Sequence, residues 1–362
     1  MRRTAALIVG GGPAGSAAAI ALARGGLRPL LVERTAEPHD VVCGGFLGWD
    51  ALAALERLGI DAPSLGAPPI GRLRLASARD TLEAPLPGAA AGLSRRTLDE
   101  ALLRQAAGAG VEVVRGRAAR AADPSRRTVR FEDGEYRADA LLLATGKHEL
   151  RGAARAVDLA GRPIGLRTAL PASAARARAL DGAIELHLFD GGYAGLLLQE
   201  DGTANLCLSV SARRFKAAGG IGRLLEQLTG ELPLLRDRVE DALPGAAWSA
   251  VSGVPYGWST NGTADGCYRL GDQAAVIASL AGDGIGIALE SGRHAAAAIL
   301  AGTPAPAYQA GFAKRAARPV GVAEALRWSA ERPLPRATLM RLLGWFPGVA
   351  RGAARLTRIG AA

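Results

Sequence analysis

The chain has 362 residues, of which 49% are hydrophobic and 22% charged, and these values exclude intrinsic disorder for most of its length. No window holds 18 uninterrupted apolar residues, so no transmembrane helix is predicted, and the apolar run near the start is too short for a signal-peptide core. The net charge of +10 is concentrated in residues 311–362, where ten basic and two acidic side chains give +8.

The first 33 residues predict a nucleotide-binding unit. Ala5–Val9 is a short apolar run typical of a parallel strand buried on both faces, and it leads into a GxGxxG turn. The Ala-rich stretch Ser16–Arg24 predicts a helix, and a second strand, Leu27–Glu33, ends in an acid. Strand, glycine turn, helix, strand and acid in this order indicate a dinucleotide site, with the diphosphate at the helix N-terminus. The residues expected at the cofactor are Gly10, Gly12, Pro13, Ala14, Gly15, Glu33 and Arg34.

Further strand and helix patterns at 94–150 and 265–305 predict that the same domain continues later in the chain. Asp139–Leu143 is another buried strand, and it ends in Ala-Thr-Gly at Thr145 and Gly146. Tyr268–Asp272 predicts a strand ending in Gly-Asp, followed by a glycine-rich turn that opens a helix at Ala281–Glu290.

Between these segments lie alternating runs that predict an antiparallel sheet. They are Ile164–Ala169, Ala183–Phe189, Tyr193–Glu200 and Thr203–Ser211, with Arg72–Ala76 as an added strand. The Asp-Gly pair at 201–202 is a strong hairpin signal. Glu185 and His187 share one strand face, and Asn205, Cys207 and Ser209 share another, so each set faces either a substrate pocket or solvent.

These motifs together resemble the FAD-binding domain of the flavoprotein superfamily that contains para-hydroxybenzoate hydroxylase and geranylgeranyl reductase. The resemblance implies that Asp272 contacts the ribityl and diphosphate region. It implies that Arg96, in a segment similar to the family's RxxLD motif, lies along the cofactor. Asp283 is expected to cap the following helix, with a catalytic role as the alternative. The further positions implied at the flavin are Cys43, Gly44, Thr145, Gly146, Gly284, Ile285, Gly286 and Ile287.

The predicted fold class is α/β, with a doubly wound FAD-binding domain, an inserted antiparallel-sheet substrate domain and a C-terminal helical segment. The FAD-binding domain is expected to be discontinuous, at 1–69, 94–163 and 255–305. The substrate domain is expected at 70–93 and 164–254, and the basic helical segment at 306–362.

The function predicted first is that of a single-component monooxygenase. It would hydroxylate an aromatic or polyketide-type molecule of secondary metabolism through a flavin C4a-hydroperoxide, with NAD(P)H as a transient reductant. The alternative is a flavin-dependent reductase of carbon–carbon double bonds in an apolar, isoprenoid-like substrate. The family's Tyr-x-Trp-x-Phe-Pro motif is reduced here to Tyr193, which weakens that reading. A non-enzymatic, basic nucleotide-binding protein is the third class.

The candidate catalytic residues are His148, Cys43 and His187. His148 follows the Ala-Thr-Gly turn and could transfer a proton, or it could be a loop residue. Cys43 is either a pocket residue or a small buried apolar group. No metal site is predicted, because four scattered histidines and three cysteines without a CxxC pair lack metal-ligand spacing.

The expected partner is a small-molecule substrate, free or bound to a carrier protein or coenzyme A, and no nucleic acid. The amphipathic, arginine-rich stretch around Ala337–Phe346 predicts either a helix packed on the flavin domain or a contact with an anionic partner such as a membrane surface. The cysteine usage favours the cytoplasm.

Overall fold

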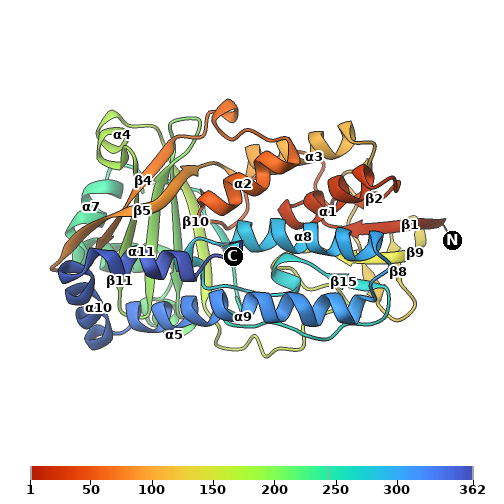
Figure 1. Cartoon of the computed structure of the whole chain (residues 1–362). Helices are drawn as coiled ribbons and strands as arrows, with labels where there is room; N and C mark the ends of the chain where they lie inside the picture. Colours follow the sequence, from red (N-terminus) through yellow and green to blue (C-terminus); the bar gives the residue numbers. More distant parts are fainter. Residues whose placement is uncertain (1, 244, 361–362) are drawn as a thin grey trace.

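The computed structural model describes residues 2–243 and 245–360, and these residues form two sheets flanked by helices (Figure 1). The seven-stranded first sheet has the order β6-β2-β1-β9-β8-β7, with β15 paired to β9. Its strands are β1 (Arg2–Val9), β2 (Leu30–Val32), β6 (Glu112–Val114), β7 (Ala121–Asp123), β8 (Thr128–Phe131), β9 (Gly134–Leu143) and β15 (Cys267–Arg269).

The eight-stranded second sheet has the order β14-β10-β13-β12-β11-β4-β5-β3. Its strands are β3 (Phe46–Leu47), β4 (Pro69–Ala76), β5 (Thr81–Gly92), β10 (Ile164–Leu170), β11 (Ala183–Phe189), β12 (Gly192–Leu198), β13 (Ala204–Val210) and β14 (Ser249–Val251). Its pairs are antiparallel except β4 with β11, which run parallel.

The centre of the first sheet is parallel, because β1 runs parallel to β2 and to β9, and β15 runs parallel to β9. Alternate residues of β1 enter two different apolar clusters, with Ala6 and Ile8 under the helices and Leu7 and Val9 on the other face. The helices on the first face are α1 (Pro13–Arg24), α2 (Trp49–Leu58), α3 (Arg95–Gly108) and α8 (Gly284–Leu300). β1 is therefore a buried strand with apolar residues on both faces, as the sequence predicted.

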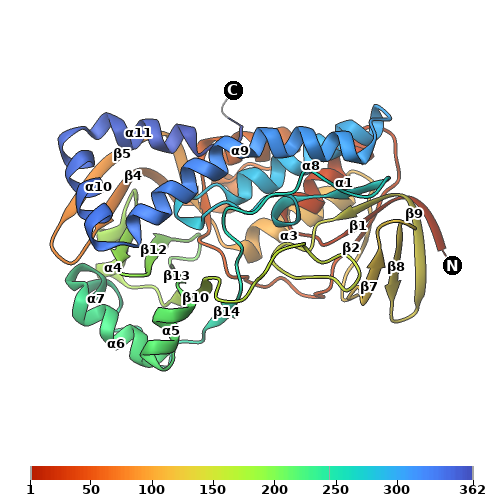
Figure 2. The same cartoon turned by 90° about the horizontal axis from the view of Figure 1, so that it is seen from below.

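One face of the second sheet is covered by short helices, which Figure 2 shows on the side away from α8 and α9. They are α4 (Ala174–Leu180), α5 (Ala212–Ala218), α6 (Ile221–Glu231) and α7 (Pro233–Val239). Leu196, Leu206 and Leu208 of the sheet pack with Leu224 and Leu228 of α6 in one buried cluster. The opposite face of the sheet is thereby left to meet the first sheet.

The C-terminal part is helical and consists of α9 (Ala305–Ala330), α10 (Pro333–Trp345) and α11 (Pro347–Leu356). Figures 1 and 2 show α9 lying along both sheets, α10 at the outer end of the second sheet, and α11 running from there back toward the start of α8. No helix in the described part of the chain is long and apolar enough to cross a membrane.

The observed architecture confirms the predicted fold class. One detail differs, because Phe46–Leu47 was assigned to the first domain but forms β3, which pairs with Gly92 and Ala91 of β5. The chain crosses from the first sheet to α2 along the open edge of β5, so its backbone groups find partners there.

Candidate active site

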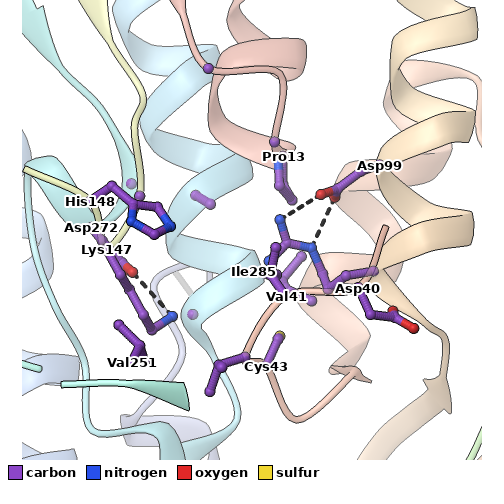
Figure 3. Close-up of a pocket in the computed structure, with 18 of the residues that line it drawn as sticks. Pro13, Asp40, Val41, Cys43, Asp99, Lys147, His148, Val251, Asp272 and Ile285 are labelled. Atoms are coloured by element: carbon purple, nitrogen blue, oxygen red, sulfur yellow. Dashed lines mark hydrogen bonds and ion pairs between the residues drawn. The ribbon is translucent and has the colours of Figure 1, made fainter. Parts of the chain in front are cut away.

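A cavity of about 600 Å³ lies where the carboxyl ends of β1, β2 and β9 meet the inner face of the second sheet (Figure 3). This is the point in an open parallel sheet where crossovers leave to both sides and ligands bind. The cavity is lined by most of the predicted cofactor residues: Gly10, Gly12, Pro13, Ala14, Glu33, Arg34, Cys43, Gly44, Arg96, Thr145, Gly146, Asp272, Gly284 and Ile285. Three others, Gly15, Gly286 and Ile287, are not part of its lining.

The glycine turn between β1 and α1 depends on glycine at two positions. Gly10 has a φ of +111°, and a Cβ there would lie 2.3 Å from the Ala144 carbonyl oxygen. A Cβ on Gly15 would lie 2.0 Å from the carbonyl oxygen of Gly10. Gly12 begins α1 without a side-chain cap, so the first backbone N–H groups of the helix are available to an anion at this end of the cavity.

Glu33 is held at the end of β2 by the turn itself. Its Oε2 accepts a hydrogen bond of 2.7 Å from the backbone N–H of Gly11, and its Oε1 accepts from the backbone N–H and hydroxyl of Thr35. The carboxylate is therefore fixed beside the cavity in the place where the sequence predicted a ribose contact.

The arginine that reaches the glycine turn is Arg95, not the predicted Arg96. Arg95 forms a two-pronged ion pair with Asp99, at 2.7 and 2.9 Å, and its guanidinium lies next to Gly12 and the Cys43 side chain (Figure 3). Arg96 lies one residue further around α3 and pairs with Asp201 at 3.2 Å, half exposed. A one-residue step turns a helix by 100°, which separates the two side chains. In RxxLD the arginine is three residues before the leucine, which is Arg95.

The turn after β9 directs Lys147 into the cavity. Its Nζ lies 3.3 Å from the carboxylate of Asp272, and the negative charge of Asp272 raises the pKa of Lys147 (Figure 3). His148 instead places its ring 2.9 Å from the guanidinium of Arg34, next to Glu33. Burial and the neighbouring Arg34 lower the pKa of His148, so its ring is neutral near pH 7 and is a poor proton donor.

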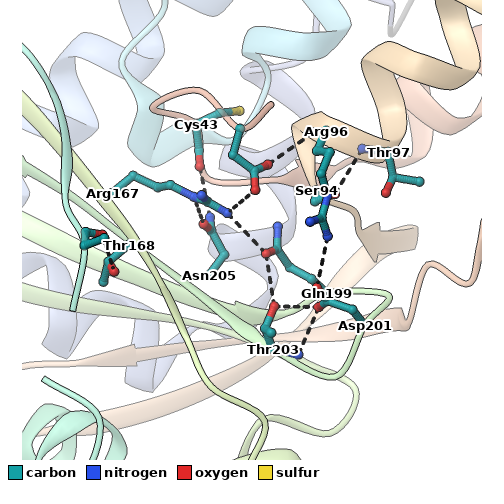
Figure 4. A network of polar contacts seen from close by, with 12 residues as sticks. Cys43, Ser94, Arg96, Thr97, Arg167, Thr168, Gln199, Asp201, Thr203 and Asn205 are labelled. Carbon is teal, nitrogen blue, oxygen red and sulfur yellow. Dashed lines mark hydrogen bonds and ion pairs between the residues drawn. The ribbon is translucent and has the colours of Figure 1, made fainter. Parts of the chain in front are cut away.

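The loop around Cys43 is fixed by a polar network on the second sheet (Figure 4). The amide of Asn205 donates to the backbone carbonyls of Cys43 and Gly44, at 2.9 and 2.8 Å. The buried Arg167 donates to the Asn205 side chain at 2.8 Å and pairs with Asp40 at 2.9 Å. Asn205 thus faces neither substrate nor solvent: it positions the loop that brings Cys43 to the cavity.

The far end of the cavity is apolar apart from a group of hydroxyls. Its walls there include Ile184, Leu186 and Leu280. Tyr193 and Tyr256 both hydrogen-bond the hydroxyl of Ser279, the latter at 2.7 Å. Burial raises the pKa of both tyrosines, so both keep their protons at neutral pH. Burial also raises the pKa of the Cys207 thiol to about 12, so that cavity residue stays uncharged.

His187 was wrongly predicted as catalytic. It lies on the opposite face of β11 from Leu186 and is not part of the cavity lining. It is fully buried and bonds Glu185, whose carboxylate also pairs with Arg74 and Arg238. The sequence predicted a pocket or solvent on this face. In the structure Arg238 of α7 lies over it and pairs with Glu185, while the Nδ1 of His187 has no hydrogen-bond partner among the described residues.

Asp283 does not cap α8 with its side chain, although it precedes that helix. Its carboxylate is buried next to Asp50, accepts from the backbone N–H of Ile359 at 3.0 Å, and lies 3.4 Å from Arg358. A C-terminal segment supplies these partners, so a local pattern could not show them. Gly286 faces this cluster, because a Cβ there would lie 2.3 Å from Asp283 Oδ1.

Comparisons with known proteins agree with this geometry. The family described as FAD binding domain matches residues 3–140. A menaquinone reductase of Mycobacterium tuberculosis is 30% identical over 315 residues, which cover 80% of this chain and 75% of that protein. The chain belongs to the FAD-dependent oxidoreductases. Its superfamily is the one that contains para-hydroxybenzoate hydroxylase and geranylgeranyl reductase.

Two further similarities were found, one in sequence and one in fold. A digeranylgeranylglycerophospholipid reductase of Methanopyrus kandleri is 29% identical over 305 residues, covering 80% of this chain and 75% of that one. The solved structure of a flavin-dependent brominase superposes with a TM-score of 0.80 at 16% identity, covering 99% of this chain and 94% of the other, and shows the shared fold.

The cavity of the flavoenzyme fits FAD. A Cβ on Gly44 or Gly284 would meet nothing within 4 Å, so both glycines leave open space along its length. The uncapped start of α1 can hold the diphosphate, Glu33 the ribose hydroxyls, and the start of α8 the electron-rich edge of the ring system. Sequence reasoning missed Lys147 and Arg95, although the position of Lys147 directly after the Thr145-Gly146 turn was a usable signal.

Proposed function

We propose that the protein is an FAD-dependent reductase of carbon–carbon double bonds in an isoprenoid-like lipid. The observation that carries the proposal is the far end of the cavity, where Ile184, Leu186 and Leu280 form an apolar wall beside the hydroxyl group of Tyr193, Tyr256 and Ser279. An apolar alkene needs such a wall for binding and a neutral acid for the proton it gains. The two reductase relatives, each similar over 80% of the chain, support this choice over hydroxylation.

When bound, FAD supplies the hydride for one alkene carbon and leaves the protein to supply a proton for the other. The wall residues hold the apolar chain and exclude water. Tyr193 or Tyr256 donates the proton from its hydroxyl oxygen, and Ser279, bonded to both, passes a replacement between them. NAD(P)H is the proposed electron donor.

The test is turnover of a geranylgeranyl lipid or an unsaturated menaquinone by reduced protein without oxygen, followed by mass spectrometry. We expect a gain of two hydrogens per reduced double bond. Substrate-stimulated oxygen consumption with insertion of an oxygen atom would instead establish the hydroxylase predicted first from the sequence.

Tyrosine variants test the proton donor. Tyr193→Phe with Tyr256→Phe should slow substrate reduction roughly 10²-fold or more, while FAD binding and flavin reduction stay unchanged. Tyr268→Phe is the matched control, because the Tyr268 hydroxyl donates to the Thr303 carbonyl at 3.0 Å and is not part of the cavity lining. Equal rates in the double variant and the control would reject the hydroxyls as the proton source.

A further inference from the structure

The corner between α10 and α11 exposes an unusual set of large apolar side chains. Leu342 is 41% exposed, Trp345 75% and Phe346 57%. Val349, in the first turn of α11, extends the set at 40%. Together these four residues form what we call the apolar corner, and exposed aromatic residues gathered in this way mark an interaction site.

The apolar corner is surrounded by positive charge. Residues 332–360 hold six arginines and no aspartate or glutamate, and two of the six pair with acids elsewhere, Arg336 with Asp190 and Arg358 with Asp283. Among the described residues, no ion pair joins Arg341, Arg351 or Arg355 to an acid, and all three are exposed. The preceding helix differs, because Arg327 of α9 pairs with two glutamates of its own helix end. Arg341, Arg351 and Arg355 therefore keep their positive charge without an acidic partner in the described part of the chain.

The inner face of α10 already has partners, so its exposed residues are not needed for packing. Met340 of α10 is 3% exposed and shares a buried cluster with Leu186 and Tyr193, which Leu343 joins at its edge. Leu186 and Tyr193 also line the cavity. The apolar wall of the cavity is thus continuous with the underside of α10, at the end of the molecule shown in Figures 1 and 2.

We propose that the apolar corner docks on an anionic phospholipid surface. Trp345 and Phe346 would enter the interfacial region, and Arg341, Arg351 and Arg355 would contact lipid phosphates. Amphipathic helices with arginines beside aromatic and leucine side chains bind membranes in this way, through apolar burial and attraction to anionic lipids. An acidic protein would also attract the arginines, but it would not by itself bury the exposed tryptophan and phenylalanine rings. The interfacial region of an anionic bilayer offers apolar chains and phosphate groups together, which suits both kinds of side chain.

This docking would place the substrate end of the flavoenzyme next to the layer that holds isoprenoid lipids, and in that respect it rests on the proposed function. Lipid binding itself needs no turnover. Loss of vesicle binding and loss of catalysis can therefore be measured independently, so failure of one proposal can be distinguished from failure of the other.

The test is co-sedimentation of FAD-loaded protein with vesicles of phosphatidylcholine alone or mixed with phosphatidylglycerol. We expect binding only to the mixed vesicles, weakening as salt is raised. Arg351→Glu with Arg355→Glu, and separately Trp345→Ala with Phe346→Ala, should each weaken binding about tenfold or more. The matched control is Arg130→Glu with Arg137→Glu on β8 and β9, two exposed arginines at the other end of the molecule, and it should bind as the parent does.

Flavin absorbance and circular dichroism verify that each variant is folded. Parent-like vesicle binding in both corner variants, or no binding of the parent to anionic vesicles, would overturn the proposal. A parent dimer that Trp345→Ala with Phe346→Ala dissociates would also overturn it, because the corner would then be covered by a second copy. Unchanged turnover of detergent-dispersed substrate by that variant would leave the reaction proposal standing.

Discussion

Replacing Arg358 by methionine should destabilise the protein strongly and in a pH-dependent way. The Arg358 side chain is 3% exposed, and its Nη1 lies 3.4 Å from Asp283 and its Nε 3.8 Å from Asp50. Its guanidinium carbon is 4.6 Å from the centre of the Trp49 ring. Methionine has a similar length but no charge, so the variant leaves two buried carboxyl groups without their cation.

Removing one partner of a buried ion pair costs about 3–5 kcal/mol, which is the loss of unfolding free energy expected at pH 7. Burial and the charge of Asp50 already raise the pKa of Asp283, and Arg358 opposes that shift. Without the arginine the pKa rises further. The folded state then binds more protons than the unfolded state, so stability falls as pH rises from about 4 towards the folded pKa. The loss at pH 5 is therefore smaller than at pH 7.

The measurement is urea denaturation of the FAD-loaded parent and variant at pH 5 and pH 7. Arg355→Met is the matched control, because Arg355 is exposed in the same segment, and it should change stability by less than about 0.5 kcal/mol. Equal losses for Arg358→Met at the two pH values would refute the role assigned to the carboxyl pair. A loss no larger than that of the control would refute the ion pair itself.

Three further substitutions test the rest of the site. Gly12→Val should raise the dissociation constant for FAD at least about tenfold, because a branched side chain would fill the diphosphate position; flavin fluorescence titration measures this, and a fully loaded variant would contradict it. Asn205→Ala should cost about 1–3 kcal/mol of unfolding free energy and weaken FAD binding, since the loop carbonyls lose their donor. Glu185→Ala should cost about 3–5 kcal/mol in denaturation, by leaving Arg238 unpaired and Arg74 with Glu83 alone, yet FAD titration should show parent-like affinity.

Much of the FAD-binding part of the chain could be predicted from the sequence, because the sequence patterns that indicate it are local. The turn at Gly10–Gly15 needs residues without a Cβ, and the flanking apolar strands and the acid at Glu33 stand at fixed spacing from it. The second sheet was also predictable, since β11 begins and ends where the alternation placed it. These features follow from backbone conformation and side-chain periodicity within single elements, and from the fixed length of one strand–helix–strand unit.

Only the tertiary structure determines what the face of a strand or helix that carries a polar residue packs against, and which group that residue pairs with. Alternation separates the two faces of β11 but does not say which one meets the cavity, so His187 was placed wrongly and Glu185 proved to be an internal ion partner. Arg95 is different, because its place three residues before Leu98 in RxxLD was a local signal for it, and the structure brings Arg95 to the glycine turn while Arg96 pairs with Asp201. The contact of Asp283 with Arg358 joins residues 75 positions apart. Burial and charge pairing of this kind depend on distances in space, which sequence spacing does not encode.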